Sequence, residues 1–326
     1  MAGALWLAAF MMGPHGVESA AAQARDRVVA NPPLLEIQKG TVPKKTLLAL
    51  PPSARLTDKK TLDLKIDYTP SEIFNGGTGR WDKVNLRSYI GARVDPNAPY
   101  VAPTIEVQPG DTVRVLLHNK LKADPSCIEN GRDPDKPHCF NGTNLHSHGL
   151  WVSPTGNSDN VLLSINPGVD FEYEYNIPPD HPAGTFWYHP HRHGSTALQV
   201  SSGMAGALIV RADRPPTPDA NGDIDTLLKN RDGTPLAERV LVLQQIQYAC
   251  LDAAGNIKVQ KEKDKDGKEQ IVAWVCDRGD VGVIEFYEDA NKNGFGPRSW
   301  GESDRYTSIN GLVLPTFRAK RGVIER

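Results

Sequence analysis

The amino-acid sequence predicts an all-β fold, and three features of the 326-residue chain support this prediction. The chain contains 29 glycines and 26 prolines, which fall between short apolar runs as turn residues do. Apolar and polar side chains alternate in residues 62–68 and 171–177, the period expected of half-buried strands. Residues 104–108 and 112–117 are two further strand-like runs, and they flank the turn sequence Pro109-Gly110-Asp111.

The N-terminus predicts export. The apolar run in residues 1–12 is too short to span a bilayer, and it leads to Ala22-Gln23-Ala24. Residues 1–24 are therefore interpreted as a signal peptide cleaved after Ala24, and a periplasmic or secreted location is expected. No Lys or Arg precedes the apolar run, so a disordered alanine-rich tail is the alternative. A start codon assigned downstream of the true one would also explain why no basic residue precedes the apolar run.

The remainder divides into an N-terminal arm at 25–60, a first domain at 61–212, a linker at 213–235 and a second domain at 236–326. The linker is predicted from a polar, proline-rich run after Arg211. The first domain should close with a strand at 203–210 that is buried on both faces.

The second domain is expected to open with a strand at 239–245. Its charged insert at 258–270 is typical of a solvated loop or hairpin tip. The chain ends within an expected strand at 324–326. About 90 residues are few for a complete sandwich domain, so this domain is predicted to be incomplete.

Charge and cysteine content narrow the class of protein. The 37 basic and 39 acidic residues nearly balance and no basic run occurs, which argues against nucleic acid as a partner. Four cysteines, none in a C-x-x-C pair, favour disulfides in an exported chain. Proximity suggests the pairs Cys127–Cys139 and Cys250–Cys276, although three connectivities are possible.

Two histidine pairs carry the strongest functional signal. His146 and His148 form one H-x-H motif, His189 and His191 form another, and no histidine follows His193. Residues i and i+2 of a strand face the same way, so each pair can direct two imidazoles at one site. Imidazole binds copper and zinc, and copper(II) binds more tightly. The alternative is that these are exposed histidines in polar loops.

Three segments resemble the N-terminal cupredoxin domain of multicopper oxidases, the laccase-like enzymes. They are residues 109–113 (PGDTV), 146–149 (HSHG) and 184–191 (GTFWYHPH). Residues 203–210 look like the last strand of that domain, and residues 308–326 are similar to part of the second domain. The resemblance implies a cupredoxin-like Greek-key β-sandwich, one complete domain plus a second incomplete one.

The resemblance also implies a cofactor and a reaction. In the family, four H-x-H-type motifs build a trinuclear copper cluster that reduces dioxygen to water while a phenol, amine or metal ion is oxidised. Carried over by motif position, His146 would bind the type 2 copper, and the type 3 pair would be bound by His148, His189 and His191.

Further residues near the motifs are assigned less directly. Asp159 matches a position where the family often has an acidic residue for proton delivery, but a loop-capping aspartate is equally consistent. His193 is expected to be a surface histidine rather than a ligand. The isolated His118, His138 and His181 are likewise expected to be ordinary surface residues.

The sequence departs from the family in its C-terminal part. The family's third motif, H-P-x-H-x-H, and its fourth, H-C-H, are absent from residues 194–326, so the type 1 copper site is absent as well. The chain is therefore interpreted as the N-terminal portion of a three-domain multicopper oxidase, truncated at Arg326, which binds copper but needs a missing C-terminal domain for oxidase activity. The alternatives are a stand-alone periplasmic copper-binding or resistance module and a non-enzymatic scaffold of the same fold.

Overall fold

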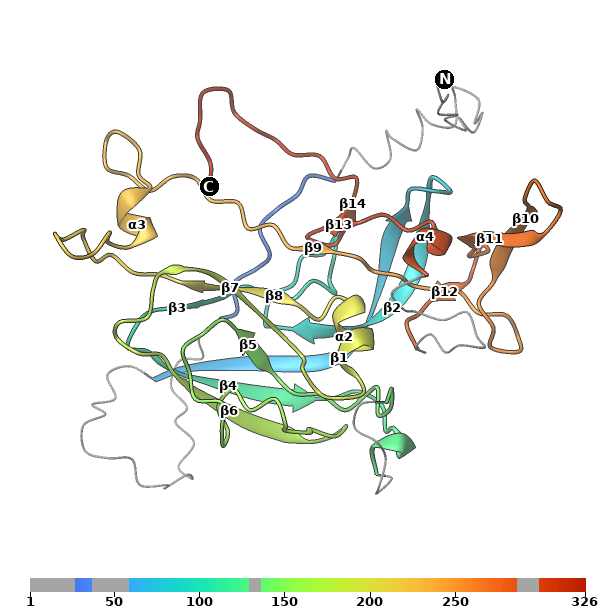
Figure 1. The fold of residues 1–326 in the computed structure, drawn as a ribbon, viewed down its shortest axis with the longest axis horizontal. Helices are drawn as coiled ribbons and strands as arrows, with labels where there is room; N and C mark the ends of the chain where they lie inside the picture. Colours follow the sequence, from blue (N-terminus) through green and yellow to red (C-terminus); the bar gives the residue numbers. More distant parts are fainter. Residues whose placement is uncertain (1–26, 37–58, 129–135, 286–298) are drawn as a thin grey trace.

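The computed structural model describes residues 27–36, 59–128, 136–285 and 299–326, and its regular secondary structure is mainly β-strand (Figure 1). One sheet has five strands in the order β12-β2-β1-β4-β6, and a second has four in the order β3-β8-β7-β5. The first contains β1 (Lys59–Asn75), β2 (Arg80–Ile90), β4 (Thr112–Asn119), β6 (Asp170–Asn176) and β12 (Val281–Gly282). The second contains β3 (Ile105–Val107), β5 (His146–His148), β7 (Gly184–His189) and β8 (Gly206–Val210).

The two sheets pack face to face as a sandwich. Buried side chains of the five-stranded sheet, such as Leu64 and Val115, belong to the same apolar core as Tyr188 and Leu208 of the four-stranded sheet. All five residues of β8 are buried, as predicted. The expected all-β, cupredoxin-like sandwich is thus confirmed.

The strands predicted from alternation and turn chemistry are all present. The turn at residues 109–111 does not close a hairpin, because it carries the chain from β3 in one sheet to β4 in the other. Gly110 adopts φ +84°, and the Asp111 carboxylate accepts a 2.7 Å hydrogen bond from the Gln108 amide. β1 is longer than expected, because its C-terminal part pairs with β2 in an antiparallel register from Lys65↔Ile90 to Asn75↔Arg80, and its N-terminal part, from Lys59 to Ile66, pairs in parallel with β4.

Residues beyond the first sandwich form small β elements. β9 (Leu243–Gln244), β13 (Ser308–Ile309) and β14 (Leu312–Val313) make a three-stranded sheet, and β10 (Val259–Lys263) pairs with β11 (Glu269–Trp274) as a hairpin. The helices are short: η1 (Pro125–Cys127), α2 (Thr196–Ser201), α3 (Ile224–Leu227) and α4 (Trp300–Ser303). The charged insert forms most of this hairpin and is largely exposed, which confirms the hairpin-tip prediction.

Two predicted strands were wrong in extent. Only Leu243–Gln244 of the strand expected at 239–245 pairs in a ladder. In the preceding residues, the Asn310 side chain takes the backbone hydrogen bonds that a neighbouring strand would make. Its NH₂ group donates to the Val240 carbonyl at 2.8 Å, and its oxygen accepts from the Val242 amide at 2.7 Å. Residues 324–326 form no strand either, because only the single bridge between Ala237 and Glu325 is made there.

The C-terminal segments pack directly against the first sandwich. β12 adds to β2 as a parallel edge strand. The buried Arg87 of β2 donates to the Ile284 carbonyl at 2.6 Å and to the Glu285 carboxylate at 2.7 Å. A second apolar core joins Ile73 and Leu86 to Tyr248 and other C-terminal residues. The division into domains at 212–236 stays a prediction.

Only part of the predicted N-terminal arm lies within the described residues. Residues 1–24, the predicted signal peptide, and residues 37–58 of the predicted arm lie outside the described residues. The described part of the arm crosses the molecule, with bridges from Val28 to Thr316 and from Leu34 to Thr104. No helix among the described residues is both long and apolar enough to cross a membrane.

Both proposed disulfides are present. Cys127 is bonded to Cys139 and Cys250 to Cys276, so none of the four cysteines in the sequence has a free thiol. This confirms the connectivity suggested by proximity along the chain.

Candidate metal centre

Pairing of β5 with β7 brings the two histidine motifs together. The antiparallel register places His146 opposite His189 and His148 opposite Trp187. Tyr188, between these β7 positions, is buried in the sandwich core. Because side chains alternate along a strand, the histidines therefore lie on the opposite, outer face of the four-stranded sheet.

The four imidazole rings form one cluster. The His146 ring lies 5.1 Å from the rings of His189 and His191 and 5.6 Å from that of His148, measured between centroids. The His189 ring lies 5.9 Å from both His148 and His191. The structure thus brings together all four histidines that the sequence predicted as ligands.

Asn144 fixes the position of His191, which lies just beyond the end of β7. The fully buried Asn144 side chain accepts a 2.6 Å hydrogen bond from the His191 amide. Its NH₂ group donates to the carbonyls of Val161 and Leu163. Sequence reasoning missed Asn144, since an asparagine two residues before an H-x-H motif gives no sign that it will bind a segment 47 residues away.

The ring nitrogens have the donor character that a metal requires. The Nδ1 of His189 donates to the Pro190 carbonyl at 2.8 Å, which leaves its Nε2 as a lone pair, and this buried atom has no hydrogen-bond partner. The buried Nδ1 of His191 likewise has no partner. Burial lowers the pKa of His189 to about 4, so this ring is neutral at pH 7. Buried nitrogens without partners are costly unless something binds them, and a metal ion fits.

Asp159 lies against the first motif. One oxygen of its carboxylate accepts from the His146 Nδ1 and from the Ser147 amide, both at 2.9 Å. A carboxylate on one ring nitrogen sets the tautomer and directs the other nitrogen toward a metal. The observed contact therefore supports an orienting role for Asp159, and the predicted role in proton delivery stays a prediction.

Replacing Asp159 with Asn tests this orienting role. The variant should bind Cu(II) about 10- to 100-fold more weakly, as is typical when a partner that orients a metal ligand is lost. The amide oxygen can still accept from the Ser147 amide, so circular dichroism should show an unchanged fold. What the variant loses is the negative charge that strengthens the hydrogen bond from the His146 Nδ1. Calorimetric titration measures the affinity, and an unaltered dissociation constant would contradict the orienting role.

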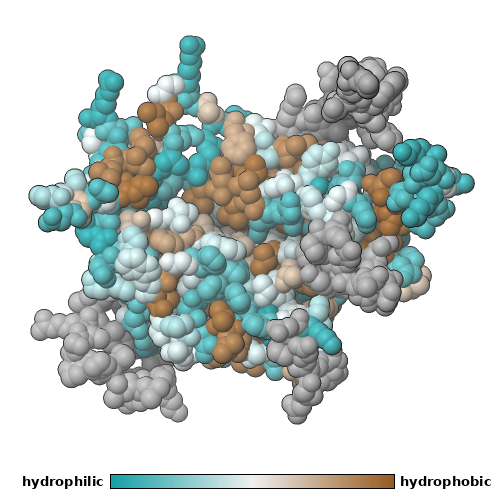
Figure 2. Space-filling model, in the orientation of Figure 1, coloured by the Kyte–Doolittle hydropathy of each residue, from teal (hydrophilic) through white to brown (hydrophobic). Residues whose placement is uncertain are grey.

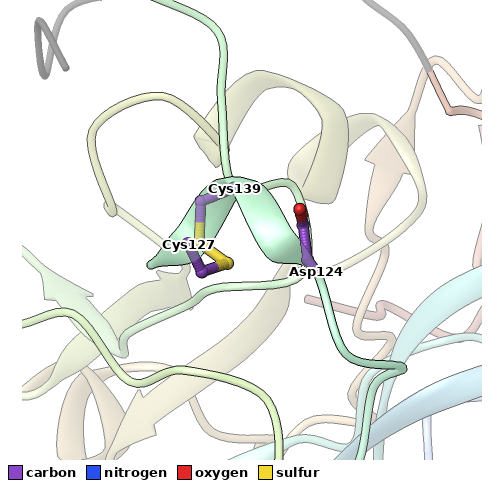
Figure 3. A group of neighbouring side chains, drawn as sticks. All are labelled: Asp124, Cys127 and Cys139. Atoms are coloured by element: carbon purple, nitrogen blue, oxygen red, sulfur yellow. A yellow bond between two sulfur atoms is a disulfide. The ribbon is translucent and has the colours of Figure 1, made fainter. Parts of the chain in front are cut away.

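No three of the four clustered histidines have ring nitrogens that all lie within 4.8 Å of one another. Among the described residues, Asp124, Cys127 and Cys139 are the only three potential ligand groups whose donor atoms all lie within 4.8 Å of one another. Figure 3 shows that the two sulfur atoms of this group are bonded to each other, so they are not thiolate ligands. The spread of the imidazoles suits donation to more than one ion.

The remaining histidines lie outside the cluster, with one correction. His118 lies between Asp63 and Asp170 and His138 is half-buried, so both are partly exposed, as expected for surface residues. His193 is exposed, and its ring lies 6.1 Å from that of His191. The surface prediction for His181 was wrong: this residue is fully buried.

His181 is buried by aromatic neighbours. Its ring lies 5.3 Å from Trp151 and 5.2 Å from Phe186. Its proline-rich surroundings in the sequence suggested a surface loop, and the contact with Trp151, 30 residues away, has no local signal.

An apolar groove of about 1170 Å³ adjoins the cluster. Its walls are the outer faces of β7 and β8, the region of α3, and the segment at 238–245. Figure 2 shows apolar residues at the surface around α3 and along the segment that leads to β9, where Leu227 and Leu243 are exposed. Trp187 lines the groove and also contacts the histidines.

The fold and the site together define an all-β protein with four clustered histidines whose ring nitrogens are suited to binding metal. A family model described as multicopper oxidase matches residues 137–215, which contain both H-x-H motifs. Over these residues the chain is similar to the multicopper oxidase family.

Relatives agree with this assignment. An iron transport multicopper oxidase of Gibberella zeae is 32% identical over 167 residues, covering 50% of this chain and 21% of the relative. Laccase-1 of Agaricus bisporus is 30% identical over 125 residues, covering 37% of this chain and 20% of the relative. A multicopper oxidase of Staphylococcus aureus is 25% identical over 218 residues, covering 66% of this chain and 40% of the relative. The alignment thus spans about a fifth of the length of the first two relatives.

Among solved structures, a multicopper oxidase from Campylobacter jejuni matches with a TM-score of 0.46 and 22% identity. The match covers 89% of this chain and 41% of that protein.

Proposed function

We propose that the four clustered histidines form half of a trinuclear copper cluster of a multicopper oxidase. The observation that carries this proposal is the juxtaposition of four imidazoles, from two H-x-H motifs on paired strands, with buried ring nitrogens that have no partner. Neutral imidazole is a preferred copper(II) ligand.

The individual roles follow from motif position. His146 would bind the type 2 copper, and His148, His189 and His191 would bind the type 3 pair. Asp159 would hold the His146 ring through its Nδ1, and Asn144 would hold the backbone at His191. When bound, copper supplies the capacity to take up electrons and pass them to dioxygen.

In the complete oxidase, this half-cluster would serve the reduction of dioxygen to water coupled to one-electron oxidation of a phenol, an amine or a metal ion. A type 1 copper site takes those electrons from the substrate, and it needs a cysteine thiolate with two histidines. All four cysteines of this chain are in disulfides, and residues 194–326 contain no histidine. The type 1 site and the other half of the cluster would therefore come from residues outside this sequence, as in a C-terminal domain.

The same observations favour a second candidate, a copper-binding or resistance module without oxidase activity. Such a module would bind copper tightly and stoichiometrically on its own. Half of a cluster would instead bind one or two ions weakly. The dissociation constant and stoichiometry of the isolated chain separate the two functions.

Export to the periplasm or the cell exterior is part of the proposal. Two disulfides support it, since such bonds persist in oxidising compartments. Mass spectrometry of the mature protein should find an N-terminus after Ala24, and an intact N-terminus on protein recovered from the cytoplasm would contradict export.

Copper titration tests the proposed function. The chain should bind one or two Cu(II) ions through nitrogen ligands, seen by electron paramagnetic resonance, and should show no intense thiolate-to-copper absorption. It should not oxidise a phenolic dye above the background of free copper. An intense blue colour or histidine-dependent turnover would contradict the half-cluster.

A further inference from the structure

Trp187 lies between the histidine cluster and the apolar groove. The ladder aligns Ala207 of β8, Trp187 of β7 and His148 of β5 in one row across the sheet. Side chains in such a row are cross-strand neighbours on one face. The row thus runs from the groove, which Ala207 and Trp187 line, to the cluster.

The indole contacts one histidine of each motif. Its ring stacks on that of His189, with 4.1 Å between centroids and 22° between planes. It also lies 5.1 Å from the His148 ring at 35°. His189 follows Trp187 by two residues and therefore shares its face of the strand.

The stack restricts the ring whose nitrogen lacks a partner. The hydrogen bond from the His189 Nδ1 to the Pro190 carbonyl constrains one edge of the imidazole, and the indole covers one of its faces. Together they leave the buried Nε2 as the free donor. Yet Trp187 is 39% exposed, so its burial alone does not explain a tryptophan here.

We infer that Trp187 is a positioning residue for copper: its indole holds the imidazoles of His189 and His148 and shields them from the groove. The inference rests on the proposed copper function. It predicts that the aromatic face matters more than the side-chain volume, and that bound Cu(II) quenches the fluorescence of Trp187 at contact distance.

Two substitutions separate these properties, and the chain offers a matched control. Trp187→Leu removes the ring face, whereas Trp187→Phe keeps one. Trp151→Leu removes a tryptophan that is 56% exposed and whose ring lies against His181 rather than the cluster. Each full-length variant is titrated with Cu(II) and followed by calorimetry, electron paramagnetic resonance and tryptophan fluorescence.

Trp187→Leu should weaken Cu(II) binding about tenfold and should alter the electron paramagnetic resonance spectrum of the bound copper. A tenfold loss is at the lower end of what removal of a partner that orients a metal ligand costs. Trp187→Phe should keep affinity and spectrum near those of the parent but lose most of the copper-induced quenching. Trp151→Leu should keep all three. Parent-like affinity and spectrum in a folded Trp187→Leu, or equal losses in Leu and Phe, would overturn the inference.

If Trp187→Leu does not fold, the fluorescence of Trp187→Phe provides the test. Parent-like copper-induced quenching in Trp187→Phe would overturn the contact between the Trp187 indole and the copper site. Loss of that quenching would support the contact. Failure of the copper proposal has a different signature. In that case the parent itself would bind no Cu(II), or a variant lacking His189 and His191 would bind it as tightly as the parent.

Discussion

Replacing both His189 and His191 with Ala should abolish specific copper binding while leaving the chain folded. The loss should exceed about 100-fold in affinity, because losing a partner that merely orients a ligand already costs about 10- to 100-fold. The two side chains hold the buried nitrogens without partners. The pKa of His189 is about 4, so at pH 7 the change removes a neutral donor rather than a charge.

His118→Ala provides the control for this double variant. His118 is on β4 in the other sheet, and its ring nitrogens already contact Asp63 and Asp170. Calorimetry and electron paramagnetic resonance should give parent-like binding for this variant, and also for His193→Ala. If the double variant still binds with parent affinity, or if His118→Ala is equally impaired, the histidine cluster is not the copper site.

Much of the first sandwich could be predicted because local sequence and tertiary structure agree there. Alternation in residues 62–68 and 171–177 places every second side chain in the core, and the strands form accordingly. The H-x-H spacing likewise fixes which way each pair of imidazoles faces. That both pairs face one site depends on the β5–β7 register, which the resemblance to the family implied and no local pattern could give.

The predictions that failed concern structure set by distant partners. Residues 239–245 have the composition of a strand, but the Asn310 side chain binds the backbone there in place of a neighbouring strand. His181 was expected at the surface and is instead enclosed by Trp151 and Phe186. Polar and aromatic contacts between segments far apart in sequence leave no periodic signal, so only the folded chain reveals them.

Removing the Cys250–Cys276 disulfide should cause a large loss of stability. The bond closes a loop with a sequence separation of 26, and such a constraint on the unfolded chain contributes about 3 kcal/mol. Both cysteines are buried in the core that joins β1 and β2 to the C-terminal segments. Their loss therefore also loosens the packing between these parts.

The double variant Cys250→Ala/Cys276→Ala should therefore unfold at lower urea concentration than the parent, with a free energy of unfolding lower by about 3 kcal/mol. Circular dichroism follows the transition, and the parent with reductant, which loses both disulfides, should shift at least as far. Copper binding below the transition should stay intact, since neither cysteine contacts the histidine cluster in the structure.

Cys127→Ala/Cys139→Ala is the matched comparison, because its disulfide closes a shorter loop, with a separation of 12, in the first sandwich. Coinciding transitions for the parent and the Cys250/Cys276 variant would show that this shared core holds the C-terminal segments without the covalent bond.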